Sequence, residues 1–215
     1  MGFQNLDAQS TTWAKIAGGK IVLTSKVALD GYVQRTNKIG NVVYELFFES
    51  FEGKLQDIRL VEGEFGPQWH LTFDDNGKTV IITTGYDNRY ARTLLNRLLN
   101  KAIDFKEKIA IKPYSFTPDD KDYTLTGCNV IQYGKKLNPR FDIKTELPQP
   151  EETTVKKQKV FNYSKQLEFL EDKIEKELRP RLPKQQAPQI PTDANGFINI
   201  EDDIDEPNLY EGLEN

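Results

Sequence analysis

The spacing of apolar residues constrains this fold most, because it follows a period of two along most of residues 20–133. That period is typical of β-strands, whose successive side chains point to opposite faces of a sheet. Gly31–Arg35 is either a separate strand or a continuation of the first one. The predicted strands are Lys20–Lys26, Gly31–Arg35, Val42–Phe51, Leu55–Glu62, Trp69–Phe73, Val80–Thr84, Lys108–Ser115 and Tyr123–Tyr133.

One segment of this region departs from the strand period. Its apolar residues recur at helical spacing, at Tyr90, Leu94, Leu95, Leu98 and Leu99. The spacing predicts a helix within Tyr86–Ala102, and Asp87 or Asn88 is placed to cap its N-terminus. Several strands, one helix and two further strands make a mainly β fold.

The composition changes near residue 147, after which Pro, Glu and Thr become frequent. Asn162–Leu178 is predicted to be a second helix. Its apolar residues form a narrow stripe, which suits docking either on the body or on a partner. We expect a domain over residues 1–145, a linker and an amphipathic helix over 146–184, and a disordered acidic tail over 185–215. The stripe comprises Leu167, Leu170, Ile174 and Leu178.

The net charge of −4 hides an uneven distribution of charge. Residues 185–215 contain eight acidic residues and no Lys or Arg, so residues 1–184 carry 29 basic and 25 acidic residues. A polyanionic tail can compete with DNA for a basic surface, recruit proteins through its apolar residues, or simply solubilise the chain. The predicted partner-binding residues of the tail are Phe197, Ile204, Leu209, Tyr210 and Leu213.

The sequence contains no motif that indicates an enzyme. It lacks a Gly-rich phosphate loop, a nucleophile elbow and a zinc signature. With one cysteine, Cys128, and one histidine, His70, it also lacks the residues for a disulfide framework or a Cys/His metal site. We therefore expect no catalytic residue, no cofactor and no metal. The absence of a long apolar run or a secretory signal predicts a cytoplasmic protein without a membrane partner.

Binding of single-stranded nucleic acid requires cations along the backbone path and flat aromatic faces for the bases. The first 145 residues contain both, often close together in sequence. Arg89, Arg92 and Arg97 fit a solvated helix face as well as phosphate contacts. The candidate phosphate contacts are Lys15, Lys20, Lys26, Arg35, Lys38, Arg59, Lys112, Lys135, Lys136 and Arg140. The candidate stacking residues are Trp13, Tyr32, Phe47, Phe51 and Tyr114, whereas Trp69 is expected in the core.

This layout resembles the single-stranded DNA-binding proteins of phages and bacteria. These proteins combine an OB-fold body, a flexible linker and an acidic C-terminal tail, and the helix within Tyr86–Ala102 has the position of the helix between the third and fourth OB strands. The resemblance implies an OB-fold-like antiparallel barrel and sequence-tolerant binding of single-stranded DNA in phage replication, recombination or repair. It also implies a location in the host cytoplasm and recruitment of replication proteins by the tail. More strands precede the helix than an OB barrel needs, which indicates an added hairpin.

A different class of protein fits the same sequence. Residues 1–147 carry 20 basic and 18 acidic residues, a weak excess for a DNA-binding domain. The alternative is a β-sandwich structural or adaptor protein of a virion or another assembly. Such a protein would bind its partner through the helix Asn162–Leu178.

Overall fold

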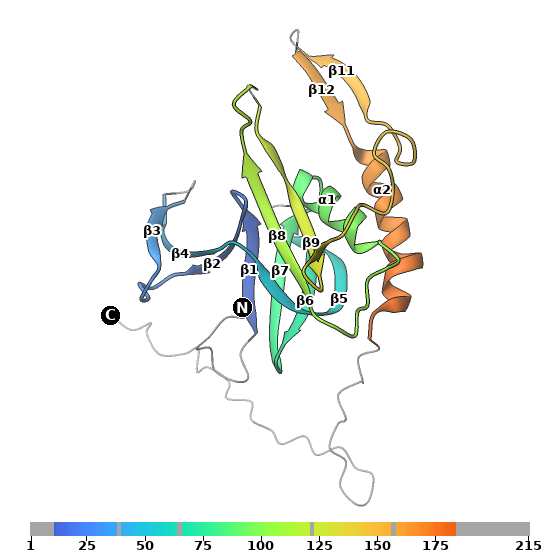
Figure 1. Ribbon diagram of the computed structural model, residues 1–215. Helices are drawn as coiled ribbons and strands as arrows, with labels where there is room; N and C mark the ends of the chain where they lie inside the picture. Colours follow the sequence, from blue (N-terminus) through green and yellow to red (C-terminus); the bar gives the residue numbers. More distant parts are fainter. Residues whose placement is uncertain (1–10, 38–39, 64–65, 121–122, 156–157, 184–215) are drawn as a thin grey trace, which may run out of the picture. The chain divides into compact units, whose positions relative to one another are not determined.

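A ten-stranded sheet dominates the computed structural model, which describes residues 11–37, 40–63, 66–120, 123–155 and 158–183 (Figure 1). The described residues belong to one compact unit. The predicted disorder of the tail concerns residues outside the described part. The strands of the large sheet are β1 (Thr12–Ala17), β2 (Lys20–Ser25), β3 (Val33–Thr36), β4 (Val42–Phe48), β5 (Phe51–Gly63), β6 (Gly66–Asp75), β7 (Lys78–Gly85), β8 (Ile109–Phe116), β9 (Leu125–Gln132) and β10 (Lys135–Lys136).

The strands of this sheet follow the order β10-β9-β8-β5-β6-β7-β1-β2-β4-β3. All neighbouring pairs are antiparallel except β1 and β7, which are parallel. The prediction of a mainly β fold with a helix between strands is confirmed. The sheet is open, however, and does not close into the predicted barrel.

The structure divides the predicted strand Val42–Phe51 into two strands. β4 ends at Phe48 and pairs with β2 and β3, whereas β5 begins at Phe51 and pairs with β6 and β8. The two residues between β4 and β5 interrupt the alternation of side chains. In β5 the odd-numbered residues at its start therefore face the core, whereas in β4 the odd-numbered residues face outward. Phe51 therefore faces the core, although it shares the odd parity of the exposed Phe47.

The helix α1 (Arg89–Leu98) covers the core with its apolar side, where Leu94, Leu95 and Leu98 are fully buried. The side chain of Asn88 caps the helix by accepting a 2.8 Å hydrogen bond from the Ala91 amide, as the sequence predicts. Trp69 is also fully buried, which confirms its predicted place in the core.

The predicted linker is partly structured. β11 (Glu151–Val155) and β12 (Gln158–Asn162) pair in a separate two-stranded sheet. The sequence did not indicate these two strands within the predicted linker, because pairing between two short polar segments depends on contacts that their own periodicity does not encode.

The second helix, α2 (Ser164–Lys173), continues through a π-helical turn, Ile174–Leu178. All four residues of its apolar stripe are buried, and Phe169 packs edge-on against Phe141 with ring centroids 5.1 Å apart. Beyond the helix, Arg179 Nε donates a 3.0 Å hydrogen bond to the Ile58 carbonyl in β5. Of the two predicted docking modes, docking on the body is therefore the one that the structure contains.

Candidate nucleic-acid interface

A row of cross-strand partners crosses the outer face of the sheet, and one member, Val22, is buried. Cross-strand partners point to the same face, and each member of this row pairs with the next one. The row includes Lys15, Phe47 and Arg59, which the sequence nominated for DNA contacts. In order through β5, β6, β7, β1, β2 and β4, it comprises Arg59, His70, Thr83, Lys15, Val22 and Phe47.

Trp13 lies beside this row on β1 and exposes 53% of its surface. Its ring meets the His70 ring edge-on, with centroids 5.4 Å apart and planes at 81°. Partial burial lowers the pKa of His70 below its ordinary value, so this contact is between neutral rings at pH 7. A pocket of about 210 Å³ opens next to Trp13 and is also lined by Lys15 and Thr83. A flat ring supported from one edge beside an open pocket suits stacking of a base.

A buried carboxylate lies on the same face. Glu45 in β4 accepts two 2.6 Å hydrogen bonds from Arg35 and one of 2.9 Å from Lys15. The Arg35 hydrogen bonds are the main cause that lowers the pKa of Glu45 to about 2; burial opposes them, and Lys15 adds to the lowering. Lys15 and Arg35, both predicted to contact phosphates, therefore share the single negative charge of Glu45. The strand period placed Glu45 on this face, but the sequence contained no signal for its ion pairs.

Glu45 should make stability sensitive to acid. Its pKa is lower in the folded protein than in the unfolded chain, so its stabilisation is present above about pH 4.5 and is lost as the pH falls toward 2. Because Arg35 and Lys15 are partly exposed, we expect a contribution of roughly 1–2 kcal/mol at pH 7. Urea unfolding of the wild type and of Glu45→Gln at pH 7, 4 and 3 measures it. The two curves should converge toward pH 3, and a gap that does not depend on pH would contradict this account.

A second group of predicted residues surrounds the turn between β1 and β2. Lys20 pairs with Glu49, and both Lys20 and Lys112 lower the pKa of that carboxylate. Gly19 has φ +77°, and a Cβ there would lie 2.6 Å from the Ser115 amide nitrogen in β8. This close approach requires glycine and holds the turn against β8, the strand that carries Lys112 and Tyr114.

The prediction that Phe51 stacks on a base is wrong. Only 1% of its surface is exposed, and its ring packs against Phe73 with centroids 5.2 Å apart. It cannot stack on a base without unfolding β5. The cause is the break in the chain between β4 and β5, which inverts the parity on which the prediction depended.

The remaining candidates are dispersed. Lys26 is exposed after β2, and Tyr32 packs partly against the core. Lys135 and Lys136 are exposed on β10, at the opposite end of the strand order from β3. Arg140 lies over the Phe141 ring, 5.0 Å from its centroid. Outside the described residues lie Lys38, Phe197, Ile204, Leu209, Tyr210 and Leu213.

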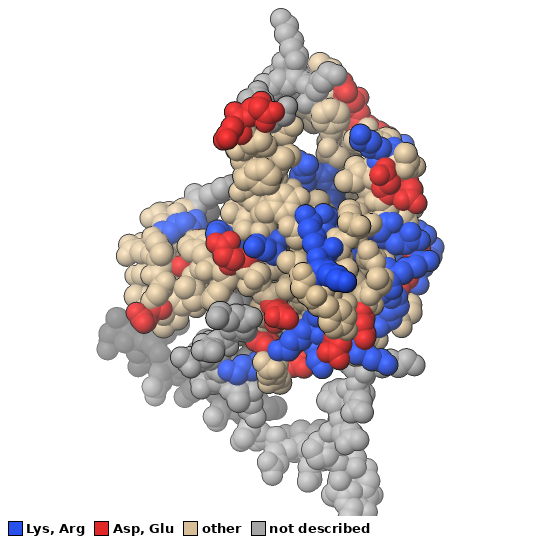
Figure 2. Space-filling model, in the orientation of Figure 1, with Lys and Arg blue, Asp and Glu red and all other residues tan. Residues whose placement is uncertain are grey.

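The distribution of charge differs between parts of the surface. In Figure 2, basic and acidic side chains alternate over much of the view, and basic ones gather on the side where Figure 1 places α1 and α2.

In the part of the chain that the structure describes, no cluster of three or more His, Cys, Asp or Glu residues could hold a metal ion. Burial raises the pKa of the Cys128 thiol, which keeps it protonated and unreactive at pH 7. None of the described helices is long and apolar enough to span a bilayer.

Comparison of this chain with models of known protein families, with curated proteins and with solved structures finds no match.

Proposed function

We propose that this protein binds single-stranded DNA without strong sequence preference, in the replication, recombination or repair of DNA, in a phage-infected cell. The observation that carries the proposal is the connectivity from β5 to β9. β5, β6 and β7 form an antiparallel meander, α1 follows, β8 returns beside β5, and β9 pairs with β8. A meander of three strands, a helix and two further strands is the arrangement of an OB-fold.

The open sheet is compatible with this proposal if β1 to β4 are an addition to the OB-like part. β1 pairs in parallel with the edge of β7, where a five-stranded barrel would otherwise close. The β1–β2 turn then packs on β8, and the Gly19 amide donates a 2.8 Å hydrogen bond to the Tyr90 hydroxyl on α1. In this interpretation the added strands widen the sheet and extend its outer face.

The outer face of the second and third OB strands is where OB-folds bind oligonucleotides. In this protein those strands are β6 and β7, and Trp13 on β1 lies directly beside them. Bases stack on Trp13 and Phe47, which are 53% and 46% exposed. Arg59, Lys15 and Arg35 lie on the same face and pair with Asp57 or Glu45, so phosphates compete with these two carboxylates for the cations.

Fluorescence anisotropy of a labelled oligo-dT tests this function. Three to five phosphate contacts predict that log K falls with log [salt] with a slope of about −2 to −3.5. Duplex DNA of the same length is the control and should bind more weakly, because its stacked bases cannot reach the aromatic rings. Absence of binding to oligo-dT at 50 mM salt would refute the proposed function.

The acidic tail is expected to weaken DNA binding by competing for the same cations. Deletion of Asp193–Asn215 removes all eight acidic residues of the tail and should tighten binding of oligo-dT, most strongly at low salt. A full-length variant with these residues changed to Asn or Gln separates charge from length. Unchanged affinity in both variants would show that the tail does not compete for the DNA-binding face.

No specific observation favours the alternative function of a structural or adaptor protein. That function requires the apolar stripe of the C-terminal helix to contact a partner. Leu170, Ile174 and Leu178 are each fully buried against the body. We therefore do not propose it.

A further inference from the structure

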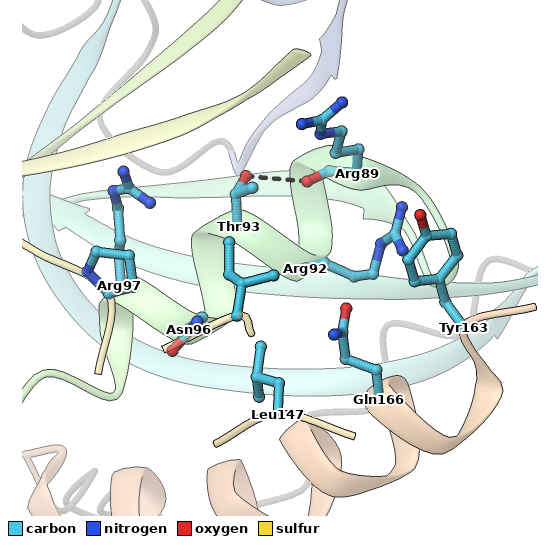
Figure 3. Close-up of a pocket in the computed structure, with 10 residues that line it drawn as sticks. Arg89, Arg92, Thr93, Asn96, Arg97, Leu147, Tyr163 and Gln166 are labelled. Carbon is cyan, nitrogen blue, oxygen red and sulfur yellow. Dashed lines mark hydrogen bonds between the residues drawn. The ribbon is translucent and has the colours of Figure 1, made fainter. Parts of the chain in front are cut away.

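A pocket of about 180 Å³ opens on the polar side of α1 (Figure 3). Three segments line it: α1 itself, residues 139–147 and the beginning of α2. Arg89, Arg92 and Arg97 of α1 are among the lining residues; their side chains extend from the helix in different directions, and that of Arg92 extends toward Tyr163 (Figure 3). The opposite side of the helix faces the core, so these arginines occupy its only polar surface.

Hydrogen bonds fix the walls of this pocket. The Asn96 side chain donates a 2.9 Å hydrogen bond to the Phe141 carbonyl and accepts one of 2.9 Å from the Phe141 amide. The Gln166 side chain donates to the Pro148 carbonyl at 3.3 Å. The segment between α1 and α2 is thereby held against both helices, and the pocket is formed before any ligand binds.

The pocket carries an excess of positive charge, although Asp87 beside it interacts electrostatically with Arg92. Its lining includes three arginines and no acidic side chain. Arg92 stacks on the Tyr163 ring, 3.3 Å from its centroid, and burial is the main cause that lowers the pKa of this guanidinium. Among the described residues, no protein acceptor bonds the buried Nε atoms of Arg92 and Arg97. Partly buried cations without a carboxylate partner are unfavourable, and a bound anion would offset that cost.

We propose that this pocket binds a phosphate monoester as its dianion. The volume is below the roughly 300–1,000 Å³ of sites for drug-sized molecules, so the pocket holds one anionic group while the rest of the ligand stays outside. Three arginines favour a dianion over a monocarboxylate, and the guanidinium fork matches the oxygens of a phosphoryl group. The site does not depend on the sheet face and can be tested without DNA.

Isothermal titration of the full-length protein with inorganic phosphate, against acetate at matched ionic strength, tests the proposal. Phosphate should bind, and acetate should give no measurable heat. Arg89→Gln should weaken phosphate binding by about 10- to 150-fold, since a charge-assisted hydrogen bond contributes about 1.5–3 kcal/mol. Arg89 is exposed, so this variant should fold normally even if Arg92→Gln does not. Lys106→Ala, which removes an exposed charge outside the pocket, is the matched control.

Two sources of the phosphate monoester can be distinguished. If the natural ligand is a DNA end, 5′-phosphorylated oligo-dT should bind more tightly than its 5′-hydroxyl form, and Arg89→Gln should abolish the difference. If the ligand is a free phosphate compound, the two oligonucleotides should bind equally while inorganic phosphate still binds. The proposal is overturned if phosphate and acetate behave alike, or if Arg89→Gln and Lys106→Ala reduce phosphate binding equally.

Discussion

Replacement of Ile174 by alanine should lower the free energy of unfolding by about 2–5 kcal/mol. Ile174 has no exposed surface and lies where the C-terminal helix packs on the body, so its removal leaves a cavity in the core. Urea unfolding measures the effect. The result would establish that residues beyond 145 belong to the cooperative folding unit and do not form an appendage.

Lys176→Ala is the matched control for this prediction. Lys176 lies on the same helical turn but is exposed, and its ion pair with Asp172 is at the surface. Its replacement should change stability by less than about 0.5 kcal/mol. If Ile174→Ala costs no more than Lys176→Ala, the docking of the second helix on the body is incorrect.

Trp13→Ala should weaken binding of oligo-dT by about 5- to 150-fold, because stacking of one base on an aromatic ring contributes about 1–3 kcal/mol. The ring is half exposed and lies edge-on to His70 on the surface of the sheet, so the variant should keep its fold. Anisotropy at 50 mM salt measures the loss. Circular dichroism verifies that the sheet is intact.

Phe161→Ala controls for the general loss of an exposed aromatic ring. Phe161 is 45% exposed and lies on β12, in the separate two-stranded sheet. Its replacement should leave DNA binding unchanged. If Trp13→Ala and Phe161→Ala weaken binding of oligo-dT equally, the outer face of the large sheet is not the DNA-binding site.

Local patterns predicted much of this fold. A period of two identified most strands of the large sheet, and helical spacing with an Asn cap located α1. Burial of Trp69 followed from its alternation with Leu71 and Phe73. These features depend on residues close in sequence, and each side chain's face follows directly from its position in the strand or helix.

Features that depend on distant residues were not predictable. The strand order, with β1 parallel to β7, depends on pairing between segments about 70 residues apart. Two residues between β4 and β5 inverted the orientation of Phe51, because a single slip in register exchanges the two faces of a strand. The first strand, β1, was missed because its inward-facing residues include the small Ala14 and only one large aliphatic residue, Ile16, so the alternation is weak.

In the candidate site, too, features set by local patterns were predicted, and features set by contacts between distant residues were not. Strand parity correctly left Phe47 exposed on the outer face, and the structure places three other predicted residues, Trp13, Lys15 and Arg59, on the same face. The pairing of Lys15 and Arg35 with Glu45 joins three strands, so no local pattern could indicate it. The arginine pocket likewise needs the segment between the helices, which carries no motif of its own.

Tryptophan fluorescence during titration with poly-dT tests the central claim most directly. The protein has two tryptophans: Trp13 is 53% exposed on the proposed binding face, and Trp69 is fully buried. At low salt, poly-dT should quench the Trp13 emission, added salt should reverse the quenching, and Trp13→Phe should lose most of the signal. No quenching of the wild-type protein at low salt would contradict binding of single-stranded DNA on this face.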